Sequence, residues 1–457
     1  MTPALTYAEQ HADQFKQELI DFLKIPSVST DASYAEEVQR AATWLADHMR
    51  EIGLTVEIIE TDGRHPLVYA EHIVSEDAKT VLFYGHYDVQ PAAIEDGWDS
   101  DPFDPVEKDG KLYARGATDD KGQMFIHVKA VEALLRSDDA LPVNVKFIIE
   151  GEEESGSQAI TAFVAEQGAK LAADVCVISD TSMSDIEQPV IINALRGVLA
   201  FELTVTGPGQ DLHSGMYGGS VHNPLQALAE FIAKFHNDEG AVAVPGFYDD
   251  VRPLSDADRE EIAALPWDNV TWSEDTGSPL PWGEDGYSLR ERIGARPTLE
   301  VNGIAGGYYG KGLKAIIPHK AWAKISCRLV ADQDPQDIME KIQRYINKIK
   351  PPTVNVEITA LGKGKEAALI NTDTPAMQAA IVAYEKGWGA QPIFKREGGS
   401  IPIVSDFQNT LNLPVIMMGF GLDTDGLHGP NEHYRIEMFH KGIQTMIHFL
   451  QQMPTIT

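Results

Sequence analysis

The chain has 457 residues, 43% of them hydrophobic, and its 69 acidic against 37 basic residues give a net charge of −32. This length exceeds what one hydrophobic core usually supports, so we expect a globular protein of two domains. The negative charge would repel phosphate backbones and anionic lipids, so neither a nucleic-acid nor a membrane partner is expected.

Helices and strands alternate in the first 195 residues. Helical periodicity covers 8–24 and 35–52, and the β-rich runs VEIIE and TVLFYGH follow. A helix is predicted from near Gly122 to Leu135, then the strand VNVKFIIE, a helix from about Ser157 and the strand DVCVISD. This alternation predicts an α/β fold with a largely parallel mixed sheet flanked by helices.

After INALRG the pattern changes to β-runs with two long helical segments, at 222–236 and 335–348. The β-runs are FELTVTG, TLEVNGI, LKAIIP, AWAKISCRLV and VNVEITA. The helix–strand alternation returns from about residue 371. We therefore predict a discontinuous first domain, 1–195 and 365–457, interrupted by an inserted α+β domain, 196–364. The Pro- and Trp-rich segment 245–287 is typical of a lid or an interface.

The two cysteines, Cys176 and Cys327, each lie inside an apolar segment. This placement predicts buried free thiols rather than a disulfide framework. The N-terminal sequence MTPALTYAEQHADQF lacks a basic region followed by an apolar one, and no apolar run reaches membrane-spanning length. These features predict a cytoplasmic location.

Acidic and histidine side chains follow the predicted strands of the first domain. Ligands in open α/β sheets bind at the carboxyl ends of the strands, so we expect these side chains to meet at one edge. They are His86 and Asp88 after TVLFYG, Glu153 and Glu154 after VKFIIEG, Asp180 after VCVIS, His428 in the loop after LPVIMMG, and Asp119 with Asp120 in RGATDDKG before a helix.

Each of these residues alone also has an ordinary explanation, as a turn acid, a helix cap or a loop histidine. Together, two imidazoles and three carboxylates suit two divalent cations, most naturally Zn²⁺, with Mn²⁺ or Co²⁺ possible. Ligation by Asp119, Glu154 and Asp180 would offset three of the four positive charges. Glu153, next to a ligand, suits the general base that takes a proton from an attacking water.

Seven segments together resemble a known family. GHYDVQPA, GWDSDPF, RGATDDKGQ, EGEEESGS, HSGMYGG, ISCRLV and GLDTDGLHGPNEH resemble, in order, signature segments of the dinuclear metallopeptidases that include carnosinase and cytosolic nonspecific dipeptidase. The similarity spans nearly the whole chain.

The resemblance implies roles for the residues at the strand ends. It implies that Asp88 orients His86 through the second ring nitrogen, that Glu153 is the general base and acid, and that Glu152 occupies a variable position. It also implies a cis peptide bond between Asp119 and Asp120. The implied metal ligands are His86, Asp119 as the bridge, Glu154, Asp180 and His428.

For the inserted domain, the resemblance implies a homodimer in which His213 enters the partner's site and stabilises the oxyanion. Arg328 would bind the substrate carboxylate, and Ser400 with Gly399 would form the remaining substrate-binding loop. One departure is Ala315, where relatives commonly carry a threonine, so a hydroxyl expected near the substrate carboxylate is missing.

The expected function is metal-dependent hydrolysis of dipeptides or very short peptides. Two alternatives stay open at this point. The same two-metal machinery would serve a deacylase of N-acyl amino acids, and a protein without catalytic activity could use the same fold for interaction.

Overall fold

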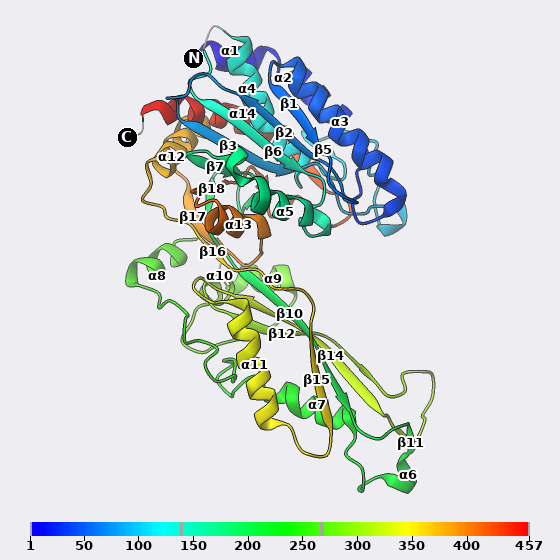
Figure 1. The fold of residues 1–457 in the computed structure, drawn as a ribbon. Helices are drawn as coiled ribbons and strands as arrows, with labels where there is room; N and C mark the ends of the chain where they lie inside the picture. Colours follow the sequence, from blue (N-terminus) through cyan, green and yellow to red (C-terminus); the bar gives the residue numbers. More distant parts are fainter. Residues whose placement is uncertain (1, 138–139, 266–268, 456–457) are drawn as a thin grey trace. The chain divides into compact units, whose positions relative to one another are not determined.

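The computed structural model describes residues 2–137, 140–265 and 269–455, and the chain folds as two compact units (Figure 1). Unit 1 comprises Met1–Asn193, Ile370–Lys395 and Pro402–Thr457, and unit 2 comprises Ala194–Leu369 and Arg396–Ile401. Residues 396–401 therefore belong to unit 2, whereas the sequence pattern places them in the first domain. Hydrophobic periodicity cannot assign these six residues to unit 2, because so short a segment has no periodic pattern of its own.

Unit 1 contains a mixed sheet in the order β1-β2-β6-β3-β7-β18-β9, with β17 also paired to β9. Its helices are α1 (Pro3–Gln10), α2 (Ala12–Leu23), α3 (Ala35–Glu51), α4 (Lys121–Arg136), α5 (Gln158–Gln167), α12 (Pro375–Gly387), α13 (Pro402–Thr410) and α14 (Ile436–Gln452). Its strands are β1 (Thr55–Ile59), β2 (Leu67–His72), β3 (Thr80–His86), β4 (Val106–Lys108), β5 (Lys111–Tyr113), β6 (Asn144–Glu150), β7 (Val175–Ile178), β8 (Ser182–Met183), β9 (Val190–Leu195), β17 (Ile393–Glu397), β18 (Val415–Met418), β19 (Gly421–Leu422) and β20 (His433–Arg435).

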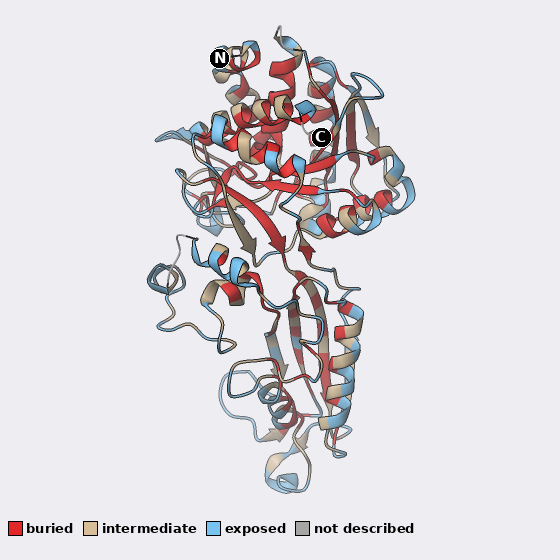
Figure 2. Cartoon of the chain, turned by 90° about the vertical axis from the view of Figure 1, so that its left-hand side faces the viewer, coloured by how far each residue is buried: buried red, intermediate tan, exposed pale blue. Residues whose placement is uncertain are grey.

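The four central strands β6, β3, β7 and β18 are parallel. They are almost entirely buried, as Figure 2 shows for the sheet, because helices cover the sheet and leave these apolar runs no contact with water. Helix α4 packs with α14, and α5 packs with α13. The predicted α/β fold with a largely parallel mixed sheet flanked by helices is confirmed.

The N-terminal helical segment is two helices rather than the single helix predicted over 8–24. Helices α1 and α2 are separated by His11, whose backbone leaves the helical region. The His11 ring nitrogen Nδ1 lies 2.8 Å from the carbonyl oxygen of Tyr7. The backbone N–H of His11 donates to the same oxygen at 3.0 Å, so both groups of His11 cap the end of α1. Periodicity does not register such a break.

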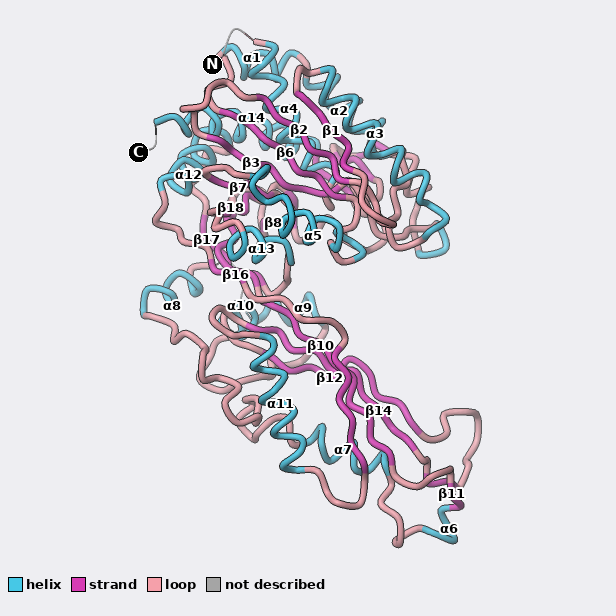
Figure 3. Tube along the Cα trace, viewed as in Figure 1, coloured by secondary structure: helices cyan, strands magenta, loops and turns pink. Residues whose placement is uncertain are grey.

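Unit 2 is built on a four-stranded antiparallel sheet in the order β12-β14-β10-β15 (Figure 3). Helices α7 and α11 pack on it around an apolar core that includes Phe201, Phe231 and Ile342. Its helices are α6 (Ser214–Tyr217), α7 (Pro224–Ala233), α8 (Asp256–Ala263), α9 (Asn269–Thr276), α10 (Leu289–Gly294) and α11 (Pro335–Ile349). Its strands are β10 (Gly197–Thr206), β11 (Leu212–His213), β12 (Thr298–Gly306), β13 (Ile316–Ile317), β14 (Lys320–Leu329), β15 (Asn355–Ala360) and β16 (Ala368–Leu369).

The segment 245–287 contains helices α8 and α9, while residues 266–268 within it lie outside the described part of the chain. Its predicted role as a lid or an interface stays a prediction. Among the described residues, no helix combines the length and the apolar character needed to cross a bilayer.

Candidate metal centre

The parallel strands of unit 1 end together, and this brings the predicted ligands to one edge of the sheet. The Cα pairing matches His86 at the end of β3 with Glu150 at the end of β6, and Tyr84 of β3 with Ile178 of β7. The residues that follow these strand ends therefore share one edge. The next turns carry Glu153 and Asp180.

Two groups of side chains could each hold a metal ion. His86, Asp119 and Asp180 form one group, and Asp119, Glu154 and His428 form the other. The Nε2 atom of His86 lies 3.1 Å from Asp119 Oδ1, and the Nε2 atom of His428 lies 3.0 Å from Asp119 Oδ2. Asp119 thus presents one carboxylate oxygen to each group, which is the arrangement of a bridging ligand.

The peptide bond between Asp119 and Asp120 is cis, as the resemblance implies. The Oδ2 atom of Asp120 accepts a hydrogen bond of 3.2 Å from the backbone N–H of His86. A side chain on Gly85 would collide with this carboxylate, since its Cβ would lie 2.7 Å from Asp120 Oδ2. Asp120 therefore fixes the end of β3 on which His86 stands.

Asp88 contacts His86, as predicted, and it also contacts the turn that carries Glu153 and Glu154. The Nδ1 atom of His86 lies 3.0 Å from the Asp88 carbonyl oxygen and 3.4 Å from Asp88 Oδ1. The Asp88 carboxylate also accepts hydrogen bonds from the backbone N–H groups of Glu153, at 3.2 Å, and Glu154, at 3.1 Å. The carbonyl oxygen of Asp88, with its carboxylate nearby, thus directs Nε2 of His86 toward Asp119, while the carboxylate holds the turn that carries Glu153 and Glu154.

The acidic triplet divides into three roles. Glu152 is buried, and its carboxylate accepts hydrogen bonds from the backbone N–H groups of His65 and Ala159. Glu154 belongs to a ligand group, and its Oε2 accepts a 2.7 Å hydrogen bond from Gln90. Burial raises the pKa of Glu153 to about 9. Glu153 is therefore the member of the triplet that suits proton transfer.

The donor set carries an excess of buried negative charge, which fits a pair of divalent cations. Burial, and then the charge of Asp119, raise the pKa of Asp180 to about 7. Hydrogen bonds to Asp119 and Glu154 raise the pKa of His428 to about 10, since these carboxylates favour the imidazolium. Three carboxylates face two imidazoles in these two groups, and nitrogen and oxygen donors in this ratio are what zinc and its neighbours bind.

Two residues outside the predicted set connect the ligand loops. Glu432 is fully buried, and its carboxylate accepts hydrogen bonds from the backbone N–H groups of Gly116, Thr118 and Asp119, at 3.0 to 3.1 Å. It also accepts a 2.7 Å hydrogen bond from Arg115, whose Nη2 lies 3.2 Å from the carbonyl oxygen of His428. Arg115 and Glu432 therefore couple the backbone of Asp119 to the loop of His428.

The His428 loop needs this support, because His428 itself has a φ of +58°. A residue with a Cβ in this left-handed region is held there by its surroundings. Arg115 and Glu432 lie within RGATDDKGQ and GLDTDGLHGPNEH, two of the segments that resemble the family. This position is the sequence feature that could have identified them. Nothing in the spacing shows that they pair.

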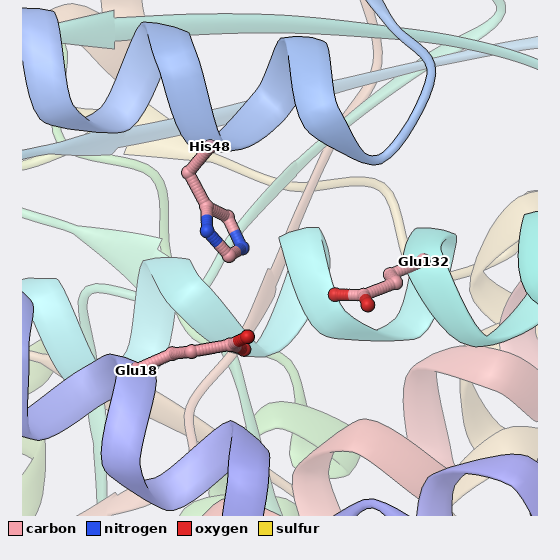
Figure 4. A group of neighbouring side chains, drawn as sticks. All are labelled: Glu18, His48 and Glu132. Carbon is pink, nitrogen blue, oxygen red and sulfur yellow. The ribbon is translucent and has the colours of Figure 1, made fainter.

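A third group with the composition of a metal site is filled by a lysine. Glu18 of α2, His48 of α3 and Glu132 of α4 converge in Figure 4. The buried Lys129 ammonium lies 2.7 Å from His48 Nε2 and 2.7 Å from Glu132 Oε2, and it also donates to Glu18. Burial, and then the charge of Lys129, lower the pKa of His48 to about 4. The group is therefore an ion cluster that joins three helices.

The remaining predicted residues lie in unit 2. The exposed His213 ends β11, while Arg328 stands near the end of β14 and donates a 2.8 Å hydrogen bond to Ser400 Oγ. Gly399 accepts a hydrogen bond from the backbone N–H of Arg196. Arg328, Ser400 and Gly399 thus come together, and His213 is separate from them.

Comparison with known proteins agrees with this geometry. Residues 82–452 match the model of peptidase family M20/M25/M40, so the chain belongs to this peptidase family. It is 30% identical to the Cys-Gly metallodipeptidase dug1 of Schizosaccharomyces pombe, over 98% of this chain and 97% of that protein. It is 31% identical to the human Beta-Ala-His dipeptidase, over 98% and 91%.

Among solved structures, the M20 family metallo-carboxypeptidase Sso-CP2 from Sulfolobus solfataricus is similar, with a TM-score of 0.86 and 31% identity. The alignment covers 97% of this chain and 99% of that one. The resemblance inferred from the seven sequence segments, a dinuclear metallopeptidase family that includes carnosinase, is thereby confirmed.

The substitution Glu432→Gln is expected to weaken metal binding by about 10- to 100-fold, because an amide cannot accept all the backbone N–H bonds that position Asp119. The measurement is metal content after dialysis against graded chelator concentrations. Glu437→Gln is the matched control, since Glu437 lies five residues on and its side chain is 63% exposed. Equal metal retention in both variants, with unchanged melting, would show that Glu432 does not position the ligands.

The substitution Lys129→Met is expected to destabilise the protein by about 3–5 kcal/mol, because it leaves the carboxylates of Glu18 and Glu132 without their cation. Urea unfolding of the full chain measures this loss. The control is Lys24→Met, which removes a half-exposed pair with Asp21 and should change stability by less than about 1 kcal/mol. Similar losses in the two variants would contradict the assignment of Lys129 as the centre of the cluster.

Proposed function

We propose that this protein is a metal-dependent dipeptidase that hydrolyses dipeptides or very short peptides. The observation that carries the proposal is the pair of ligand groups sharing Asp119, with the partly buried Glu153 beside them. Family membership and the dipeptidase names of two relatives support it.

Two divalent cations at His86, Asp119, Glu154, Asp180 and His428 would supply Lewis acidity and lower the pKa of an attacking water toward ~7. The donor set favours Zn²⁺, with Mn²⁺ or Co²⁺ as alternatives. Nitrogen and carboxylate oxygen ligands without thiolate suit all three ions.

Glu153 acts as the base and then as the acid. Its environment raises the affinity of the carboxylate for a proton, and nearby cations would lower it again toward neutrality. It can therefore take a proton from the attacking water and deliver it to the leaving amine. Asp88 holds the backbone N–H of Glu153, so the position of the base is tied to that of His86.

The strand lengths of unit 2 support a site shared between two chains. His213 pairs with Ile316 next to the beginning of β14, whereas Arg328 lies near its other end. The eight residue steps from Lys320 to Arg328 span roughly 26 Å, while a dipeptide extends about 7 Å. His213 and Arg328 of one chain therefore cannot flank the same dipeptide. A second copy of the chain resolves this, with His213 acting in the partner's site.

The surroundings of His213 favour this role. Its Nδ1 accepts a 3.0 Å hydrogen bond from the backbone N–H of Gly215, so the neutral ring carries its proton on Nε2 and can donate to an oxyanion. Large apolar side chains nearby are exposed, which is typical of a surface covered by a partner. They are Met216 and Tyr217 of α6, and Tyr308, Tyr309 and Leu313 of the loop before β13.

The substrate carboxylate would be bound by Arg328, with Ser400 and Gly399 forming the adjoining loop. Ala315 lies at the other end of the sheet, where its carbonyl oxygen accepts a 3.0 Å hydrogen bond from Ser214. The hydroxyl missing at Ala315 is therefore missing beside His213. In a shared site, its effect on the substrate would come from the partner chain.

A cytoplasmic location is part of the same proposal. Both Cys176 and Cys327 are free and buried, as a reducing compartment allows.

The variant Glu153→Gln should retain both metal ions yet lose several orders of magnitude in kcat on unblocked dipeptides, because an amide cannot accept the proton of the water. Metal analysis and steady-state kinetics measure the two effects, with exposed Glu166→Gln as the control. Near-normal turnover by Glu153→Gln would remove it from the mechanism. Turnover of N-acetyl amino acids in place of dipeptides would favour the deacylase.

Mixing two inactive variants tests the shared site. If subunits of Glu153→Gln and His213→Ala exchange, each mixed dimer contains one site with both residues intact. Random pairing of equal amounts makes about half the dimers mixed, so activity should recover to roughly a quarter of wild type. A mixture of Glu153→Gln with His428→Ala is the control and should recover nothing, since both residues belong to unit 1. Exchange without recovery in the first mixture would reject the shared site.

A further inference from the structure

Arg196 lies between β9 and β10 and holds the loop 398–400 at three points. Its backbone N–H donates to the carbonyl oxygen of Gly399 at 3.1 Å, and its Nε donates to that of Gly398 at 3.0 Å. Its own carbonyl oxygen accepts a hydrogen bond from Ser400 Oγ. All of these residues belong to unit 2, so the arrangement is internal to that unit.

The third contact decides what the Ser400 hydroxyl can do. A hydroxyl has one proton, and Ser400 donates it to the backbone of Arg196. The Ser400 oxygen is then an acceptor, and Arg328 Nη1 donates to it at 2.8 Å. Ser400 therefore orients Arg328 rather than donating to a substrate, and Arg196 orients Ser400.

The two guanidinium groups also influence each other through their charges. Burial, and then the charge of Arg328, lower the pKa of Arg196 to about 10. The charges of Glu397 and Glu300 oppose this shift. Two half-buried cations that repel each other form a natural site for an anion, because an anion between them relieves the repulsion.

We propose that Arg196 is the second arginine of the substrate's carboxylate subsite, a positioning residue that sets the preference for a free over an amidated C-terminus. This inference rests on the proposed dipeptidase function. Arg196 acts through two means, the loop that places Ser400 against Arg328 and the positive charge that disfavours a neutral C-terminal amide.

The experiment compares kcat/KM for an unblocked dipeptide and for its C-terminal amide. In Arg196→Gln, the preference for the free dipeptide is expected to fall by about 10- to 100-fold, the size of a hydrogen bond to a charged group, mostly through KM. Arg196→Lys keeps the charge without the contact to Gly398 and should fall between Arg196→Gln and wild type. The control is Arg252→Gln, which removes an exposed arginine of unit 2 and should leave the preference unchanged.

Gly398→Ala separates position from charge. A Cβ at residue 398 would lie 2.9 Å from Arg196 Nη2 and 3.0 Å from Ile293 Cγ2, so it displaces the guanidinium while every charge remains. We expect a reduced preference here too, with metal content and melting unchanged.

The outcomes distinguish this inference from the function on which it rests. Wild-type protein that hydrolyses neither substrate after metal loading would overturn the proposed function. Wild-type protein that hydrolyses both substrates equally well would overturn the proposal that the site recognises the C-terminal carboxylate of the substrate. A strong wild-type preference that persists in Arg196→Gln and in Gly398→Ala would overturn the role of Arg196 alone.

Discussion

More carboxylates are buried at one edge of the parallel strands than that edge has cations to offset, and the rest of unit 1 is arranged around this constraint. A buried carboxylate is stable only where hydrogen-bond donors or positive charges surround it. Asp119 has two imidazoles, and the ligand groups as a whole fit metal ions. Asp88 and Glu432 instead accept backbone N–H groups from the loops that carry the ligands. The same charges that require compensation thus hold the site in place.

The proximity of the candidate ligands could be predicted, because strand ends are visible in the sequence. An apolar run that stops at His86, or at the turn before Glu154, gives both the strand and the edge at which its neighbours end. Parallel order then brings these positions together without knowledge of side-chain contacts. The α/β class followed from the same alternation, whereas the place of Asp119 between the two groups was implied by the family resemblance.

The contacts between distant loops were not predictable in this way. Arg115 and Glu432 are separated by 317 residues, and the proton of Ser400 goes to a carbonyl oxygen 204 residues away. No periodicity relates such positions, so only the folded chain shows that they meet. The cluster of Glu18, His48 and Glu132 also forms only in the folded chain, and although its composition would suit a metal, the Lys129 ammonium occupies it.

Unit 2 imposes a constraint of distance rather than charge. Strands β10 and β14 pair over ten residues each. Residues at the two ends of this pair are therefore held far apart, at a distance that the sheet fixes. One end carries Arg328 with its supporting loop, and the other carries His213. A rigid sheet cannot bring both to one small substrate. This separation within one chain is the reason for proposing that Arg328 and His213 serve different sites, each completed by a second copy of the chain.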